Sequence, residues 1–269
     1  MTFYYKSITT FVSAVDIIQD MLIVFFNILR IYILLLIRYF GFIFAKNKQD
    51  WLDIAVLDFA QKVLSYNKIK IEIIGEEYLK KLKNKSIVIM SNHLSWFDTP
   101  IFLATMPFRP AFIVKKELLK IPILGFFIKA IGCEPLNRKS KVQGYRAIVH
   151  AAQTAKNHNW IIFPEGTRSK TKMVNKFRLG SIHLPLMAKS DILPVTIIDS
   201  DDVLLNLMAK KSSQVKIIIS EPIAYSAYSQ SEKSAVLHNI HQIIKNNYIK
   251  YQNKSDYIPQ ETESIPIMP

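Results

Sequence analysis

The chain has 269 residues, half of them hydrophobic, and carries a formal net charge of +14 at pH 7. This length fits either one large domain or a domain plus an appendage, and it is long enough for a substantial core. The single cysteine, Cys133, excludes an internal disulfide and a cysteine-rich zinc site, and we interpret it as a buried thiol. Residues 101–190 contain sixteen Lys or Arg against three Glu, so they attract a polyanion: nucleic acid, an acidic membrane surface or a phosphorylated substrate.

Residues 12–45 form the most apolar stretch of the chain, but two arginines interrupt it. It is therefore not a clean transmembrane helix of 18 or more uncharged residues. Its polar residues recur at spacings that keep one stripe of a helix polar: Asp16, Asp20, Asn27, Arg30 and Arg38. We expect residues 1–48 to form a membrane-anchoring helical segment that either spans the bilayer or lies in its interface. A buried helix of a soluble core is the alternative.

After this segment, short β-rich runs alternate with helical ones. The predicted strands cover residues 70–74, 86–90, 111–114, 160–163, 192–198 and 215–220. The predicted helices cover residues 50–66, 99–106, 124–130, 142–157, 177–187 and 233–250. This alternation predicts a single α/β domain over residues 49–252, with a largely parallel sheet flanked by helices. Residues 253–269 are rich in proline and predict a flexible C-terminal tail.

His93 and Asp98 follow the predicted strand 86–90, where active sites of α/β sheets gather. On a regular helix the two residues would lie about 140° apart and could not touch. Pro100 suits the first turn of the next helix, so His93 falls in the loop and the chain can fold it back on Asp98. A carboxylate against one ring nitrogen fixes the tautomer and stabilises the imidazolium. From these residues alone, a plain helix cap at Asp98 beside an ordinary loop histidine remains equally open.

Two further turns carry cations. Residues 163–169 follow the apolar run 160–163; there Gly166 lets the backbone approach a ligand, and Arg168 offers a planar fork suited to phosphate. Another turn runs from Gly132 to Arg138. Each turn taken alone is also compatible with a solvated arginine on a surface loop.

Together these segments resemble the ordered blocks of glycerolipid acyltransferases, closest to the 1-acylglycerol-3-phosphate (lysophosphatidic acid) acyltransferase group. The blocks are Asn92-His93-x4-Asp98, Lys115-Lys116-Glu117-Leu118 with Pro122 and Gly125, Gly132 to Arg138, Phe163-Pro164-Glu165-Gly166-Thr167-Arg168, and Leu193-Pro194-Val195. The resemblance covers residues 70–200, and several blocks in order are more specific than any single one. Two positions depart from the pattern: Arg178 stands where lysine is frequent, and Asn137 where an acidic residue often precedes the arginine.

The resemblance implies that His93 is the base that deprotonates the acceptor hydroxyl and that Asp98 orients and polarises it. The acceptor is then 1-acylglycerol-3-phosphate and the product phosphatidic acid. The acyl donor is acyl-CoA or acyl carrier protein, without cofactor or metal. The residues implied in binding the acceptor phosphate are Lys115, Arg138, Glu165, Gly166, Thr167 and Arg168. Because the chain has no Gly-x-Ser-x-Gly elbow, no acyl-enzyme is expected.

The remaining basic residues are expected to hold the domain against anionic headgroups, at about 1 kcal/mol per well-placed cation. Lys46 and Lys48 favour a cytoplasmic position for the chain that follows them, which suggests the cytoplasmic side of a bacterial inner membrane. Nucleic acid is not an expected partner, since no binding motif for it is recognisable.

Three alternatives remain at this point. One is the acylation of another lysophospholipid, such as lysophosphatidylglycerol, lyso-ornithine lipid or lysocardiolipin. The second is a basic membrane-binding or nucleic-acid-binding module without catalysis, which the net charge permits. The third is a non-catalytic lipid-binding relative, which the presence of both His93 and Asp98 disfavours.

Overall fold

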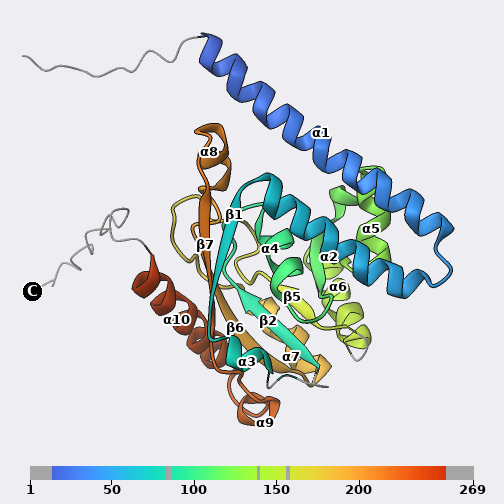
Figure 1. The fold of residues 1–269 in the computed structure, drawn as a ribbon. Coiled ribbons are helices and arrows are strands. Elements are labelled where there is room, and N and C mark those ends of the chain that lie inside the picture. Colours follow the sequence, from blue (N-terminus) through green and yellow to red (C-terminus); the bar gives the residue numbers. More distant parts are fainter. Residues whose placement is uncertain (1–13, 81, 83–85, 138–139, 156–157, 253–269) are drawn as a thin grey trace, which may run out of the picture.

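The computed structural model describes residues 14–80, 82, 86–137, 140–155 and 158–252 (Figure 1). Within these residues the chain forms a seven-stranded sheet in the order β1-β7-β6-β2-β5-β3-β4. The strands are β1 (Ile69–Ile74), β2 (Ile87–Ser91), β3 (Ala111–Lys115), β4 (Glu134–Leu136), β5 (Trp160–Ile162), β6 (Asp191–Ile198) and β7 (Ser213–Ile219). The predicted tail, residues 253–269, and the beginning of the predicted anchor lie outside the described part.

Helices flank this sheet, as Figure 1 shows. They are α1 (Ala14–Phe44), α2 (Lys48–Tyr66), α3 (Glu76–Lys80), α4 (Asp98–Thr105), α5 (Leu124–Ala130), α6 (Lys141–Thr154), α7 (His183–Ala188), α8 (Val203–Met208), α9 (Tyr225–Tyr228) and α10 (Lys233–Tyr251). Two 3-10 turns, η1 (Lys116–Lys120) and η2 (Leu179–Ile182), complete the described elements. Helix α2 packs on α4 and β1, whereas α7 packs on β2 and α10 on β6.

The sheet is parallel except where β6 meets β7. Every residue of β2 is buried, and so is every residue of β6 after its first. Such continuous apolar strands are typical of a parallel sheet covered on both faces. The predicted α/β class with a largely parallel sheet is therefore confirmed.

The predicted strands begin and end within two residues of the observed ones. Strand β4 was not predicted, because its three residues include Pro135 and give no periodicity to read. The predicted helix 177–187 is instead the 3-10 turn η2 followed by α7. The short helices α3, α8 and α9 were also not predicted, because each is six residues or fewer.

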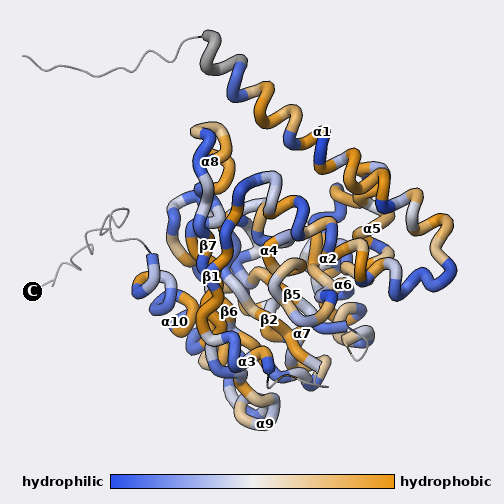
Figure 2. The backbone as a smooth tube through the Cα atoms, viewed as in Figure 1, coloured by the Kyte–Doolittle hydropathy of each residue, from blue (hydrophilic) through white to orange (hydrophobic). Residues whose placement is uncertain are grey.

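Helix α1 lies against α2, and the part of its polar stripe from Asn27 to Arg38 faces inward. Three residues of the stripe make these contacts: Asn27 with Asn67, Arg30 with the ring of Tyr66, and Arg38 with Asp58. Large apolar side chains of α1 are exposed at intervals from Met21, at 67%, to Phe44, at 81%. Figure 2 shows that hydrophobic residues recur along this part of the helix. The part Gln19–Phe44 is long and apolar enough to cross a membrane, and 11% of its most apolar 18-residue window is buried.

Candidate active site

The candidate site forms at the carboxyl ends of β2, β5 and β6. Asn92, the first residue after β2, is fully buried, and its side chain holds two strands together. Its Nδ2 donates to the carbonyl of Ile197 at 2.8 Å, and the Ile197 N–H donates to Asn92 Oδ1 at 2.9 Å. The loop that carries His93 therefore starts from a point fixed between β2 and β6.

His93 and Asp98 are in contact. His93 Nδ1 lies 2.6 Å from Asp98 Oδ2, and the same oxygen accepts the backbone N–H of Leu94 at 2.8 Å and of Ser95 at 3.1 Å. Asp98 is the first residue of α4, yet its carboxylate faces back onto the preceding loop, and it is fully buried. An ionised carboxylate only accepts hydrogen bonds, so in a neutral His93 facing it Nδ1 carries the proton and Nε2 keeps its lone pair.

The other oxygen of Asp98 accepts a hydrogen bond from a residue that sequence reasoning did not find. Ser200 Oγ donates to Asp98 Oδ1 at 2.5 Å, across 102 positions of the chain. Ser200 follows β6 and is fully buried. No motif marked this serine, because its position depends on β6 lying next to β2 in the sheet.

The imidazole of His93 is also held from the side and through its backbone. The ring of Phe163, directly after β5, stacks on it with centroids 4.1 Å apart and planes 15° apart. The carbonyl of His93 accepts the backbone N–H of Ser169 at 2.7 Å. With 16% of its side chain exposed, His93 is mostly buried but still reaches the surface.

Glu165 connects the loop that carries His93 to the loop that carries Asn175 through hydrogen bonds. Its Oε1 accepts the backbone N–H of His93 at 2.9 Å, and its Oε2 accepts the backbone N–H of Asn175 at 3.2 Å and the Nδ2 of Asn175 at 2.6 Å. Burial raises the pKa of the Glu165 carboxyl, and the bonds from His93 and Asn175 oppose that rise. The predicted phosphate-binding role of Glu165 stays a prediction; in this geometry its carboxylate joins two loops.

The turn after Glu165 depends on Gly166 and Arg178. Gly166 has φ +73°, and an added Cβ would lie 2.7 Å from Arg178 Nε, so a larger residue would be strained and crowded. Arg178 Nε donates to the carbonyl of Glu165 at 3.1 Å, and its backbone N–H donates to that of Pro164 at 2.9 Å. The arginine that replaces the frequent lysine thus holds this turn in place.

Thr167 and Arg168 are exposed at the end of this turn. The guanidinium of Arg168 lies 4.3 Å from the ring centre of Trp96, which belongs to the loop between His93 and Asp98. Trp96 itself is 65% exposed. Arg168 is therefore an accessible cation held beside the loop of His93. Within the described part of the chain, no salt bridge between Arg168 and a carboxylate is observed.

Two other predicted cations are placed differently. Lys115 ends β3, on the same edge of the sheet, and its ammonium group lies 3.8 Å from the Glu117 carboxylate. Among the interactions of the described residues, none joins Lys115 to His93 or Glu165. Arg138 lies outside the described residues.

Within the described residues, neither Cys133 nor a cluster of metal ligands provides a second candidate site. Burial raises the pKa of the Cys133 thiol to about 12, so the thiol is protonated near neutral pH and is a poor nucleophile. The residues that the structure describes contain no group of three or more His, Cys, Asp or Glu arranged to hold a metal ion.

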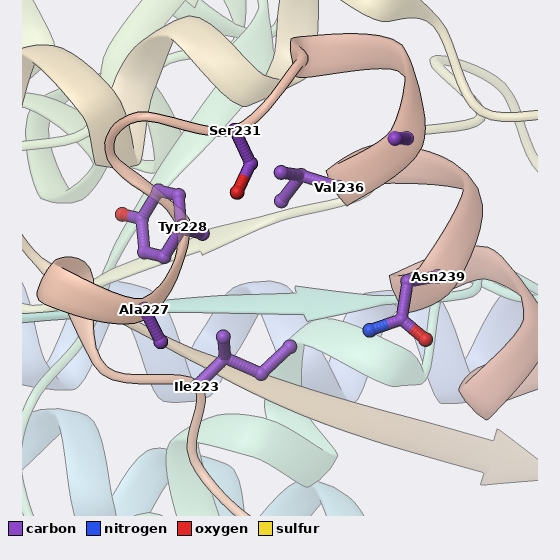
Figure 3. Close-up of a pocket in the computed structure, with 7 residues that line it drawn as sticks. Ile223, Ala227, Tyr228, Ser231, Val236 and Asn239 are labelled. Carbon is purple, nitrogen blue, oxygen red and sulfur yellow. The ribbon is translucent and has the colours of Figure 1, made fainter.

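A pocket of about 240 Å³, whose lining residues are drawn in Figure 3, lies near the start of β6, away from the candidate site. It is lined by α9, α10 and Ile223, which bridges to Ile192 near the start of β6. It contains none of the predicted site residues, because they gather where the parallel strands end rather than where they begin.

Comparison with known proteins decides the family. The sequence matches the family described as Acyltransferase over residues 70–198. A 1-acyl-sn-glycerol-3-phosphate acyltransferase of Borreliella burgdorferi is 30% identical over 184 residues, 68% of this chain and 71% of that relative. The chain belongs to the acyltransferase family. A Saccharomyces cerevisiae protein of the same name is 32% identical over 136 residues, which are 48% of this chain and 43% of the relative.

Family membership makes this protein an acyltransferase enzyme and confirms the resemblance drawn from the sequence blocks. The crystal structure of the 1-acyl-sn-glycerophosphate (LPA) acyltransferase from Thermotoga maritima is similar, with a TM-score of 0.73 and 20% identity. The likeness covers 87% of this chain and 97% of that one. At this identity it shows the fold alone, and the fold agrees with the predicted α/β domain and its N-terminal apolar helix.

Proposed function

We propose that this acyltransferase moves a fatty acyl group from an acyl thioester to the free hydroxyl of 1-acylglycerol-3-phosphate, forming phosphatidic acid in phospholipid biosynthesis. The observation that carries the proposal is the contact between His93 and Asp98 beside an accessible Arg168. It pairs a base with a cation suited to phosphate, which are the two parts this reaction needs. The names of the Borreliella and Saccharomyces relatives support the choice of acceptor.

In this mechanism His93 acts as general base. Nε2 removes the proton of the acceptor hydroxyl while Asp98 stabilises the imidazolium through Nδ1. The hydroxyl oxygen then bonds to the thioester carbonyl carbon and gives a tetrahedral intermediate. When that intermediate collapses, the carbon–sulfur bond breaks and the imidazolium returns its proton to the leaving thiolate. General base catalysis contributes about 10²- to 10⁴-fold, so positioning of the two substrates must supply much of the rest.

The acceptor phosphate is assigned to cations at the same edge of the sheet. Arg168 is exposed and can offer its fork to two phosphate oxygens. Lys115 and Arg138 remain proposed contributors, and Gly166 and Thr167 bring the backbone close to the ligand. Glu165 moves in this proposal to a positioning role, because its carboxylate is buried and already accepts three hydrogen bonds. The donor is acyl-CoA or acyl carrier protein, and no cofactor or metal takes part.

The membrane is proposed as the place of reaction, with residues 1–48 as anchor, 49–252 as catalytic domain and 253–269 as tail. Helix α1 contacts α2 from Asn27 onward, and Tyr39 and Phe42 contact Phe126 of α5. A helix attached to its own domain over this length lies along the membrane interface, with its apolar sides in the lipid. The catalytic domain is assigned to the cytoplasmic side of a bacterial inner membrane, following Lys46 and Lys48.

An acceptor panel tests the proposal. The purified protein in detergent micelles is mixed with a labelled acyl donor, either acyl-CoA or acyl-loaded acyl carrier protein, and with one lysolipid at a time. The panel contains lysophosphatidic acid, lysophosphatidylglycerol, lyso-ornithine lipid and lysocardiolipin. We expect labelled phosphatidic acid as the main product, and no product from His93→Ala.

Two results would overturn the proposal in different ways. If the enzyme prefers another lysolipid, the acceptor named in the proposal is wrong but the catalytic role of His93 and Asp98 is kept. Turnover by His93→Ala at the wild-type rate would remove the catalytic pair itself.

A further inference from the structure

The geometry points to Ser200 as a positioning residue that fixes the carboxylate of Asp98 against His93. The inference rests on the proposed function, because it assigns Ser200 a role only through that pair. Its basis is the 2.5 Å hydrogen bond from Ser200 Oγ to Asp98 Oδ1, the oxygen that does not face the histidine. Both Ser200 and Asp98 are fully buried.

The two oxygens of Asp98 are held from different parts of the chain. Oδ2 accepts three hydrogen bonds, all from residues 93–95 of its own loop. Oδ1 accepts its hydrogen bond from Ser200, after β6. Rotation about the Cβ–Cγ bond would move both oxygens together, so the hydrogen bond from Ser200 to Oδ1 adds a second restraint on the plane of the carboxylate, from a distant part of the chain. Ser200 therefore helps to set the plane in which Oδ2 meets Nδ1.

Removing the hydroxyl would leave a charged oxygen buried without its donor. Asp98 has no surface exposed to bulk solvent. A buried charged group without a partner is unfavourable, so the carboxylate would turn or take up a new donor to recover a hydrogen bond. Either response moves Oδ2 away from His93 and weakens the stabilisation of the imidazolium.

The surrounding structure holds Ser200 in place. Strand β6 pairs with β2 up to Ser91 and Val195, and the Asn92 side chain bonds to Ile197 beyond that point. Asp199 then adopts φ +63°, a left-handed conformation that turns the chain back after the strand. Two residues past Ser200, Asp202 is joined to Lys172 at 2.9 Å. The hydroxyl is thus positioned by a paired strand on one side and an ion pair on the other.

The test compares two buried serines at the two ends of β6. Ser200→Ala should lower kcat about 10- to 100-fold while the KM of the acceptor stays within about twofold, since only the geometry of the base changes. Ser190→Ala is the matched control. Ser190 precedes β6, is also fully buried, and bonds through its hydroxyl to Ser86 at the edge away from the site. It should keep the wild-type kcat.

A double substitution separates positioning from a general structural effect. If Ser200 acts through Asp98, adding Ser200→Ala to Asp98→Ala should leave kcat where Asp98→Ala alone puts it. Ser200→Thr, which keeps a hydroxyl, should recover most of the lost rate. The inference would be overturned if the losses in kcat of the two single variants multiply in the double variant, or if Ser200→Ala keeps the wild-type kcat.

Failure of the proposed function would appear in the acceptor preference of the wild-type enzyme, whereas failure of the inference would appear only in the Ser200 variants. If wild type acylates a different lysolipid, the same kinetic series is run with that acceptor. If no acceptor is turned over, the His93 Nδ1–H proton resonance gives the result instead. Ser200→Ala should shift or broaden it, and Ser190→Ala should not; an unchanged resonance in Ser200→Ala would contradict the inference.

Discussion

Two regions of the molecule differ from the usual distribution of residues, in opposite ways. One is the edge of the sheet that carries the candidate active site, at the carboxyl ends of β2, β5 and β6, which we call the catalytic edge. The other is the outer face of α1. At the catalytic edge, polar side chains are buried: Asn92, Asp98 and Ser200 fully, and Glu165 almost so. On α1 the large apolar side chains are exposed, among them Phe25 at 58% and Ile28 at 62%. Folded proteins place few groups in either position without a reason.

The difference between the two regions shows how each is stabilised. The buried polar groups at the catalytic edge are satisfied within the protein, by hydrogen bonds that join β2, β5 and β6. The large apolar side chains on the outer face of α1, such as Phe25 and Ile28, are left exposed by the described chain. The named polar groups at the catalytic edge are thus satisfied by the protein itself, whereas the exposed apolar face of α1 fits the lipid contact proposed for it.

The largest effect is expected at the catalytic edge. His93→Ala should reduce kcat about 10²- to 10⁴-fold, because it removes the base of the proposed mechanism. The side chain lies in a loop and its removal leaves the apolar core intact, so the melting temperature should change little. Turnover with lysophosphatidic acid and thermal unfolding are measured on the same preparation.

Asp98→Asn is the companion substitution. It should lose a large part of the same rate, because a neutral amide stabilises the imidazolium poorly. Near-normal turnover in His93→Ala, or losses in both variants that track a lowered melting temperature, would mean that the pair is structural.

Much of this comparison could be predicted from the sequence. The strands were predictable because a buried parallel strand is a short apolar run between turn residues, and residues 86–90 and 192–198 are such runs. The contact of His93 with Asp98 could be anticipated because both residues belong to one loop, close in sequence. The stripe on α1 could be anticipated because helical periodicity is local.

What could not be predicted depends on residues distant in the sequence. Ser200 reaches Asp98 only because β6 is placed beside β2, and no local pattern reveals strand order. The interior position of the Glu165 carboxylate depends on Asn175 and on the backbone of His93. The stripe on α1 showed which residues were polar, but not that they would face α2.

The second effect concerns the accessible cation beside the buried network. Arg168→Ala should lower kcat/KM for lysophosphatidic acid about 10- to 100-fold, mainly through the acceptor KM, because a charge-assisted contact to phosphate is lost. The KM of the acyl donor should stay unchanged. Lys170→Ala, at another exposed cation of the same loop, is the control and should have a small effect. Equal changes in both KM values would indicate that Arg168 shapes the site as a whole.

A third and smaller effect is expected on the outer face of α1. Replacing both Phe25 and Ile28 with serine removes apolar area that the proposal places in lipid, so binding to anionic vesicles should fall about tenfold or more at high salt. Ile249→Ser, at an exposed apolar residue of α10, should leave binding unchanged. Salt is kept high so that the basic surface contributes little. Unchanged vesicle binding by the double variant would remove the anchor from the proposal.

The smallest expected effect concerns Asp199, a partly buried carboxyl at the catalytic edge. Burial and the neighbouring Asp202 and Asp201 raise the pKa of Asp199 from 3.8 to about 6. Because the folded-state pKa of this carboxyl lies above its unfolded-state pKa, the ionised form destabilises the folded protein. With respect to this group, the protein is therefore most stable below the unfolded-state pKa, and this stability is lost as pH rises through about 6. Asp199→Asn should therefore stabilise the protein at pH 8 by about 1 kcal/mol, after allowance for solvent screening.

The gain should shrink as pH falls through about 6 and disappear near pH 4, where the wild-type carboxyl is protonated as well. Asparagine tolerates the positive φ at this position, so backbone strain does not obscure the result. For a chain of this size, the expected difference in melting temperature at pH 8 is about 2–4 °C. Glu221→Gln, at an exposed carboxylate, is the matched control. A difference that keeps its size from pH 8 to pH 4 would show that the charge of Asp199 costs the catalytic edge nothing.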